Sequence, residues 1–191
     1  MKTLLATALL AVAGCATPRI DQPRDFFANL STLCGKAYEG RIASPPVAAD
    51  ASFAGKRLVM HVRDCTADMI RIPFHVGDDR SRTWVVTRTT AGYRLKHDHR
   101  HEDGSEDKVT QYGGDSATPV AALRQLFPAD DFTKALLLRE NNPAGVDNVW
   151  AVEVAPGRTF AYELRRPGRF FRVEFDLTQP ISPPPPPWGA R

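Results

Sequence analysis

Three of the five histidines lie close together, at positions 97, 99 and 101. In a β-strand, such alternate residues point to one face of the sheet. An acidic residue follows a few positions later, so histidines and a carboxylate could gather near the end of a hairpin. Two histidines and one carboxylate are typical ligands of iron or a similar divalent ion. The candidate site residues are His97, His99, His101 and Glu106.

The residues between the histidines and the acid predict how this segment folds. Asp103-Gly104 is a strong signal for a tight hairpin turn. With these two residues as the turn, His101 lies opposite Glu106. The pattern then has three interpretations: a solvated hairpin tip whose acids and histidines pair locally, a divalent metal site, or another polar role such as contact with an anion or a heme.

Sequence motifs of other chemistries are absent. The chain contains no H-E-x-x-H, no G-x-S-x-G, no Walker loop and no G-x-G-x-x-G. We therefore assign no catalytic residue and expect no cofactor, apart from the divalent metal of the alternative interpretation.

Length and composition limit the classes of protein that the chain can belong to. Its 191 residues suffice for one domain with a buried core. The net charge is +3 and 42% of the residues are hydrophobic, which excludes a wholly disordered chain. A nucleic-acid binder usually carries a concentrated basic excess, so we expect no nucleic-acid partner.

The N-terminal segment has the parts of an export signal. Lys2 supplies a positive charge, and residues 3–13 are uncharged, mostly apolar and too few to cross a bilayer. The run ends in Val12-Ala13-Gly14-Cys15, which resembles the lipobox of bacterial lipoproteins. The resemblance implies cleavage before Cys15, a diacylglycerol on its sulfur and an acyl chain on its new amine.

The same resemblance implies a location. Ala16, rather than Asp, follows the lipidated cysteine, and in enteric lipoproteins this directs the protein to the outer membrane. Several acyl chains would hold it there stably. We expect a signal peptide over 1–14, a lipidated tether over 15–23, one β-rich domain over 24–178 and a Pro-rich tail over 179–191, facing the periplasm.

The remaining cysteines form an even pair. With Cys15 assigned to lipid, Cys34 and Cys65 are left of the three cysteines. The periplasm is oxidising, so we expect a disulfide between them, with two buried free thiols as the alternative.

Hydrophobic periodicity predicts mostly strands. Helical spacing is confined to residues 25–34 and 128–139, and residues 117–127 fit either a strand or a helix. The predicted strands cover 36–42, 57–65, 68–76, 82–90, 93–101, 106–113, 148–155, 158–165 and 169–178.

About 8–10 short antiparallel strands joined by tight turns usually close into a barrel or form a sandwich. A helix, a first strand containing Gly40 and then a long meander are similar to calycin-type barrels, the lipocalins and fatty-acid-binding proteins. Aromatic residues are expected in the core or as cavity lining, and arginines on the strands are expected on solvent faces. The residues concerned are Trp84, Trp150, Phe171 and Phe175, and Arg71, Arg82, Arg88 and Arg94.

The C-terminal tail contains Pro183–Pro187 followed by Trp188, a polyproline II segment. It has three interpretations: a stiff disordered end, a ligand for a partner's groove, or a clasp on the protein's own surface.

Two functions follow from these features. The first is a non-catalytic, lipid-anchored module that binds a small or apolar ligand or contacts an envelope protein through its tail. The alternative is a metal-binding protein or metal-dependent enzyme built on the histidine hairpin.

Overall fold

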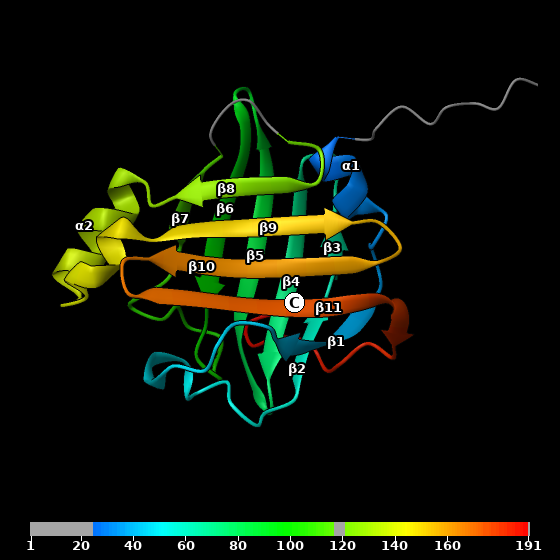
Figure 1. Ribbon diagram of the computed structural model, residues 1–191, viewed down its shortest axis with the longest axis horizontal. Coiled ribbons are helices and arrows are strands. Elements are labelled where there is room, and N and C mark those ends of the chain that lie inside the picture. The colour runs from blue at the N-terminus through cyan, green and yellow to red at the C-terminus, as the bar shows by residue number, and fades with distance from the viewer. Residues whose placement is uncertain (1–24, 117–120, 191) are drawn as a thin grey trace, which may run out of the picture.

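The computed structural model describes residues 25–116 and 121–190. Within these ranges the chain is mainly β: eleven antiparallel strands form a nearly closed barrel, accompanied by two α-helices (Figure 1). The predicted fold class is confirmed. The predicted signal peptide, Cys15 and the tether lie outside the described residues.

The helices are short, and the strands range from two to thirteen residues. The helical elements are α1 (Phe26–Ser31), η1 (Ala48–Asp50), α2 (Asp131–Arg139) and η2 (Pro143–Asp147). The strands are β1 (Ala37–Ile42), β2 (Leu58–His61), β3 (Asp64–Cys65), β4 (Met69–Val76), β5 (Asp79–Thr89), β6 (Gly92–His99), β7 (Tyr112–Asp115), β8 (Arg124–Pro128), β9 (Val149–Ala155), β10 (Thr159–Arg166) and β11 (Arg169–Ile181).

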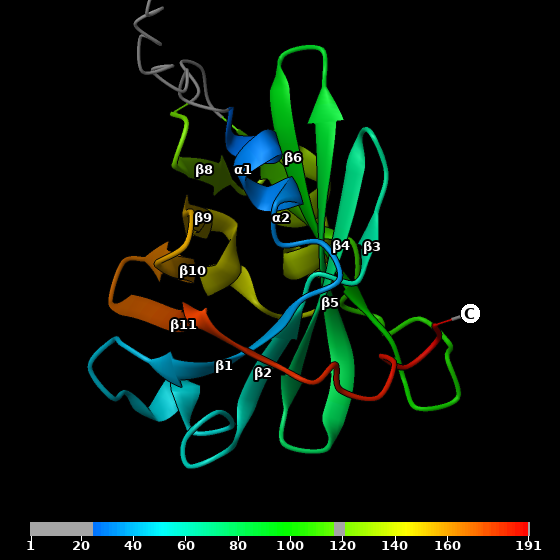
Figure 2. The same ribbon diagram turned by 90° about the vertical axis from the view of Figure 1, so that its right-hand side faces the viewer.

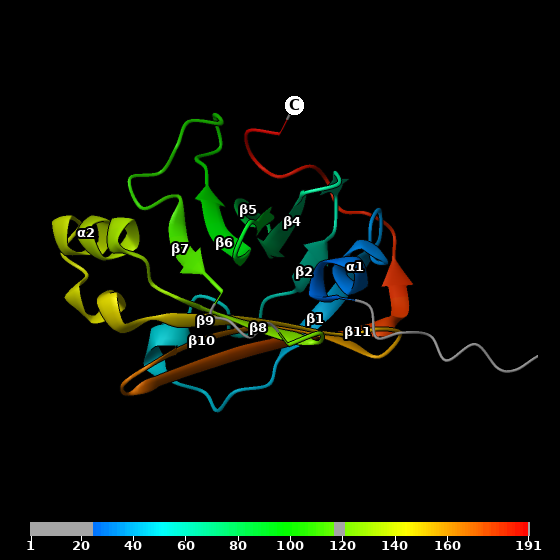
Figure 3. The ribbon, with the colours of Figure 1, turned by 90° about the horizontal axis from the view of Figure 1, so that it is seen from above.

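One sheet runs through the whole barrel in the order β7-β6-β5-β4-β2-β1-β11-β10-β9-β8, with β3 paired to β4. In Figure 1 strands β8–β11 cross in front of β4–β6 at a steep angle, and Figure 3 shows them as a separate layer seen edge-on. The two layers enclose the core. Alternate residues of β11 point into it, and Phe171, Val173, Phe175 and Leu177 are buried. Phe171 and Phe175 were expected there.

The barrel closes between β7 and the segment after β8 without a strand ladder. The hydroxyl of Thr133 accepts from the N–H of Gly113 (2.7 Å) and donates to its carbonyl oxygen (2.8 Å). A Cβ on Gly114 would lie 1.7 Å from the carbonyl oxygen of Pro128, so only glycine permits this approach. The two sheet edges are therefore joined through the start of α2.

The two helices lie at opposite ends of the barrel (Figures 1 and 3). Asp25 caps α1 by accepting from the N–H of Ala28 (2.7 Å). Phe26, Phe27 and Leu30 of α1 are almost completely buried in the core, so α1 covers one end. At the other end α2 leaves room for the cavity described below.

A disulfide joins Cys34, just after α1, to Cys65 in β3, with a Cα–Cα distance of 6.2 Å. The predicted bridge is confirmed. The bridge links the segment that follows α1 to β3, which pairs with β4.

The C-terminal tail lies on the protein's own surface. The N–H of Trp188 donates to the carbonyl oxygen of Arg80 (3.1 Å), and the Arg80 guanidinium donates to the carbonyl oxygen of Pro186 (2.9 Å). Figure 2 shows this segment, in red, running from β11 toward the green loop after β6, where Gly189 approaches Gly104. Of the three interpretations of the tail, the clasp is the one observed.

No helix in the described part of the chain is long and apolar enough to span a bilayer.

Candidate functional site

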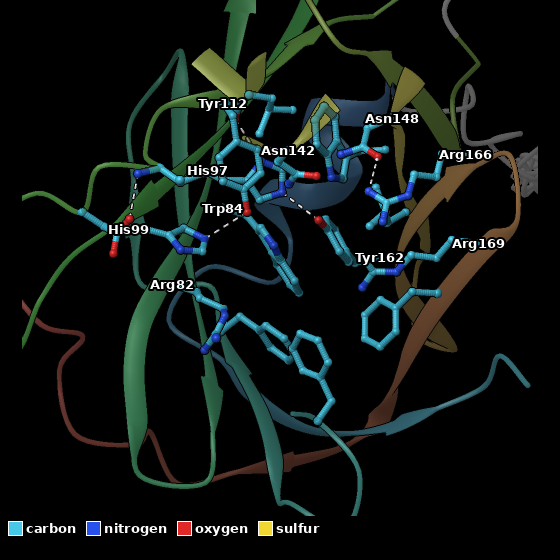
Figure 4. A pocket seen from close by; sticks show the side chains of 18 residues that line it. Arg82, Trp84, His97, His99, Tyr112, Asn142, Asn148, Tyr162, Arg166 and Arg169 are labelled. Atoms are coloured by element: carbon cyan, nitrogen blue, oxygen red, sulfur yellow. Dashed lines mark hydrogen bonds between the residues drawn. The ribbon is translucent and has the colours of Figure 1, made fainter. Parts of the chain in front are cut away.

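A cavity of about 320 Å³ lies at the end of the barrel beside α2 (Figure 4). Strands β5, β6 and β7 supply one side, and the adjoining ends of β9, β10 and β11 supply the other. Its floor is aromatic and its sides carry histidines, asparagines and arginines. The labelled side chains are Arg82, Trp84, His97, His99, Tyr112, Asn142, Asn148, Tyr162, Arg166 and Arg169.

The aromatic floor is a set of packed rings. The ring centroids of Trp84 and Tyr162 lie 4.4 Å apart in a stacked arrangement, and those of Phe74 and Trp84 lie 4.7 Å apart. Trp150 packs beside His97 at 5.2 Å. Trp84 and Trp150 therefore line the cavity as well as the core, as the sequence predicted. Such contacts hold the floor rigid and present flat apolar surfaces to a ligand.

His97 lies at the deep side of the cavity with both ring nitrogens engaged. Nδ1 is 3.0 Å from the carbonyl oxygen of Tyr112, which can only accept, so Nδ1 carries the proton. Nε2 must then accept from the hydroxyl of Tyr162, at 2.7 Å. Burial lowers the pKa of His97 to about 3. The imidazole is therefore neutral at physiological pH.

His99 lies on the same face, closer to the cavity mouth. Its Nε2 is 3.1 Å from the hydroxyl of Tyr112. Burial and then the charge of Arg82 lower the pKa of His99 to about 4, while Asp107 opposes this shift. Burial also raises the pKa of Tyr112, so both side chains are neutral hydrogen-bonding groups.

His101 and Glu106 lie outside the cavity lining. Glu106 pairs across the hairpin with Arg100, whose guanidinium lies 3.0 Å from its carboxylate. Nε2 of His101 is 3.9 Å from Asp107. Within residues 25–116 and 121–190, no group of three or more histidine, cysteine, aspartate or glutamate side chains is arranged to hold a metal ion. The structure thus brings His97 and His99 to one site and leaves the other two candidates apart.

The predicted hairpin register is wrong. The turn is longer than Asp103-Gly104, because the N–H of His101 bonds to the carbonyl oxygen of Ser105 and that of Gly104 bonds back to His101. This extra residue places Arg100, rather than His101, opposite Glu106. The predicted strand over 106–113 is also largely absent, since β7 begins only at Tyr112.

Three arginines enter the cavity, and sequence reasoning missed all of them. Arg82 was expected on a solvent face but lines the cavity and pairs with Asp79. Arg169 pairs with buried Asp50. The signal that could have revealed Arg166 and Arg169 is alternation, because each continues the inward-facing series of its strand, after Tyr162 and before Phe171.

The other expected surface arginines do pair near the surface. Arg71, Arg88 and Arg94 contact Asp98, Asp25 and Asp115, respectively.

Comparison with protein-family models, with curated proteins and with solved structures gives no match.

Proposed function

We propose that the protein binds a small molecule in this cavity and that it does so at the bacterial cell envelope, anchored through a lipid on Cys15. The cavity itself is the observation that supports the binding of a small molecule. Its volume of about 320 Å³ falls within the range of small-molecule sites. An aromatic floor with a few convergent polar groups is the usual lining of such sites.

The polar groups of the floor favour binding over catalysis. His97 uses one nitrogen on the Tyr112 carbonyl and the other on the Tyr162 hydroxyl. A general base needs a free acceptor within reach of the proton that it removes. The His97–Tyr162 pair instead fixes two rings in the cavity wall.

Two features support the location. The segment Val12-Ala13-Gly14-Cys15 resembles a lipobox. The Cys34–Cys65 disulfide fits an oxidising compartment such as the periplasm. A lipid anchor would keep the barrel at the membrane surface while its cavity exchanges ligand.

Expression of the full chain with its leader in a Gram-negative host tests the anchor. We expect the intact mass to show loss of residues 1–14 and the addition of acyl chains, and Cys15→Ser to abolish acylation. A chain that keeps its leader, or an unacylated wild-type protein, would contradict the anchor.

Native mass spectrometry of the same material after mild detergent extraction tests ligand binding. We expect a co-purifying small molecule, or uptake of an added aromatic probe at a one-to-one ratio. Trp150→Ala removes part of the cavity floor and should weaken that uptake, whereas Phe132→Ala, at an exposed position of α2, should leave it unchanged. Absence of both a native ligand and probe uptake would overturn the proposal.

A further inference from the structure

Arg166 differs from the other two cavity arginines in its partners. Within the described ranges Arg82 and Arg169 each pair with an aspartate, whereas no carboxylate lies within ion-pair distance of Arg166. Its guanidinium donates to the amide oxygen of Asn148 over 3.4 Å. Figure 4 shows Arg166 and Arg169 entering the cavity from the same side. The cavity therefore holds a positive charge whose partner is not supplied by the described chain.

Arg166 is only partly buried, and its surroundings disfavour its positive charge in part. Burial and the nearby charge of Arg169 lower the pKa of Arg166, and Asp50 acts in the opposite sense. Asp107, the acidic residue among those that line the cavity, acts on His99 and Tyr112. An anion at Arg166 would relieve the repulsion from Arg169 and would gain charge-assisted hydrogen bonds.

Next to this cation lie flat apolar walls. Trp150, Tyr162 and Leu164 line the same cavity, and Trp84 extends the floor. Planar rings match such walls well because aromatic surfaces stack with little loss of conformational freedom. The volume of about 320 Å³ is near the lower end for ligand sites, so a small ring system fits better than a long chain.

We propose that the ligand is a small aromatic carboxylate whose anion lies at Arg166 and Asn148 and whose ring lies against Trp150 and Tyr162. This rests on the proposed function and specifies its ligand class. The guanidinium offers two parallel donors that match the two oxygens of a carboxylate.

Isothermal titration of the purified protein at pH 7.5 with 2-naphthoate and 2-naphthalenemethanol tests the proposal, because the two probes share a ring and differ in charge. We expect the acid to bind about tenfold more tightly than the alcohol, as a charge-assisted hydrogen bond would give. Arg166→Gln should abolish this preference, because it should weaken the binding of the acid about tenfold more than the binding of the alcohol. Arg166→Lys should retain part of the preference.

Arg139→Gln is the matched control. Arg139 lies on α2 at the same end of the barrel, is 64% exposed and does not line the cavity, so the preference should persist. Equal binding of both probes to the wild type would overturn the anionic ligand, and an unchanged preference in Arg166→Gln would overturn Arg166 as the site of the anion. Either result leaves the binding function standing. Binding of neither probe would overturn the aromatic carboxylate, and together with the absence of a co-purifying ligand it would overturn the binding function as well.

Discussion

The hydroxyl of Tyr162 lies 2.7 Å from Nε2 of His97, deep in the cavity floor. Because Nδ1 of His97 donates to a carbonyl oxygen, the tyrosine is the donor in this bond. The pair links β10 to β6, two strands on opposite sides of the barrel that are not neighbours in the sheet. It therefore ties the two layers together at the point where the ligand would lie.

Removing the donor should destabilise the fold. Tyr162→Phe leaves Nε2 of His97 buried without a partner, and we expect the free energy of unfolding to fall by about 1–3 kcal/mol. Urea denaturation measures the change. Tyr38→Phe is the control, since Tyr38 is also a buried core tyrosine but makes no side-chain hydrogen bond in the described residues, and it should cost less than about 1 kcal/mol. Equal effects of the two substitutions would contradict a structural role for the bond.

Acid should weaken the fold through His97. Its pKa is about 3 in the folded state and about 6.5 in the unfolded chain, so the unfolded state binds more protons between these values. Stability is therefore full above pH 6.5 and falls as the pH decreases toward 3. Between pH 7 and pH 4.5 we expect the wild type to lose about 2 kcal/mol more than His97→Gln, which cannot titrate.

Urea denaturation of both proteins at the two pH values checks this difference. Paired carboxylates contribute equally to both proteins and cancel in the comparison. Parallel loss of stability in the two proteins would show that His97 is not held neutral by the fold.

Sequence patterns were enough to predict an antiparallel barrel or sandwich, because period-2 alternation indicates which face of a strand is buried, but they did not distinguish the two architectures. The alternating face of β11 is an example, since Phe171 and Phe175, expected in the core or as cavity lining, are both buried. The pairing of β1 with β11 was not accessible, because Tyr38 and Pro180 are partners that lie far apart in the chain. No local sequence pattern indicates which distant strands pair with each other.

The cavity was predicted only in part. His97 and His99 were singled out for their spacing, and they do share a face, but their polar partners are tyrosines from β7 and β10 rather than a metal and Glu106. The predicted hairpin register was wrong because the turn has one residue more than predicted, and this shifts the cross-strand partner of each residue by one position. Arg166 was missed because a charged residue beside Pro167-Gly168 fits an exposed strand end equally well.

The disulfide should supply a substantial part of the stability. Cys34 and Cys65 are 31 positions apart, and closing a loop of this length stabilises by about 3–4 kcal/mol in the chain-entropy model. We expect a loss of this size in the Cys34→Ser/Cys65→Ser double variant, measured by thermal and urea denaturation. A reductant should destabilise the wild type to a similar extent and leave the double variant unchanged. A double variant as stable as the oxidised wild type would contradict this role.

The tail should control the environment of His75. This buried histidine of β4 lines a groove together with Pro184, Pro185 and Trp188, and its Nε2 has no hydrogen-bond partner in the described chain. Burial, followed by the charge of Arg80, lowers the pKa of His75 to about 4. Deletion of residues 184–191 should expose the ring and raise this pKa toward 6.5.

A pH titration of the histidine NMR signals measures this pKa. His97, at the cavity, should keep its low pKa in the truncated chain and serves as the internal control. An unchanged pKa of His75 after deletion would show that the tail does not cover it.

The three tryptophans offer the most direct test of ligand binding, because Trp84 and Trp150 line the cavity and Trp188 lies in the tail. The indole N–H signals of the ¹⁵N-labelled protein, assigned by single Trp→Phe variants, can be followed during titration with 2-naphthoate. Binding in the cavity predicts saturable shifts of the Trp84 and Trp150 signals while the Trp188 signal stays in place. Unmoved Trp84 and Trp150 signals, or a shift confined to Trp188, would contradict it.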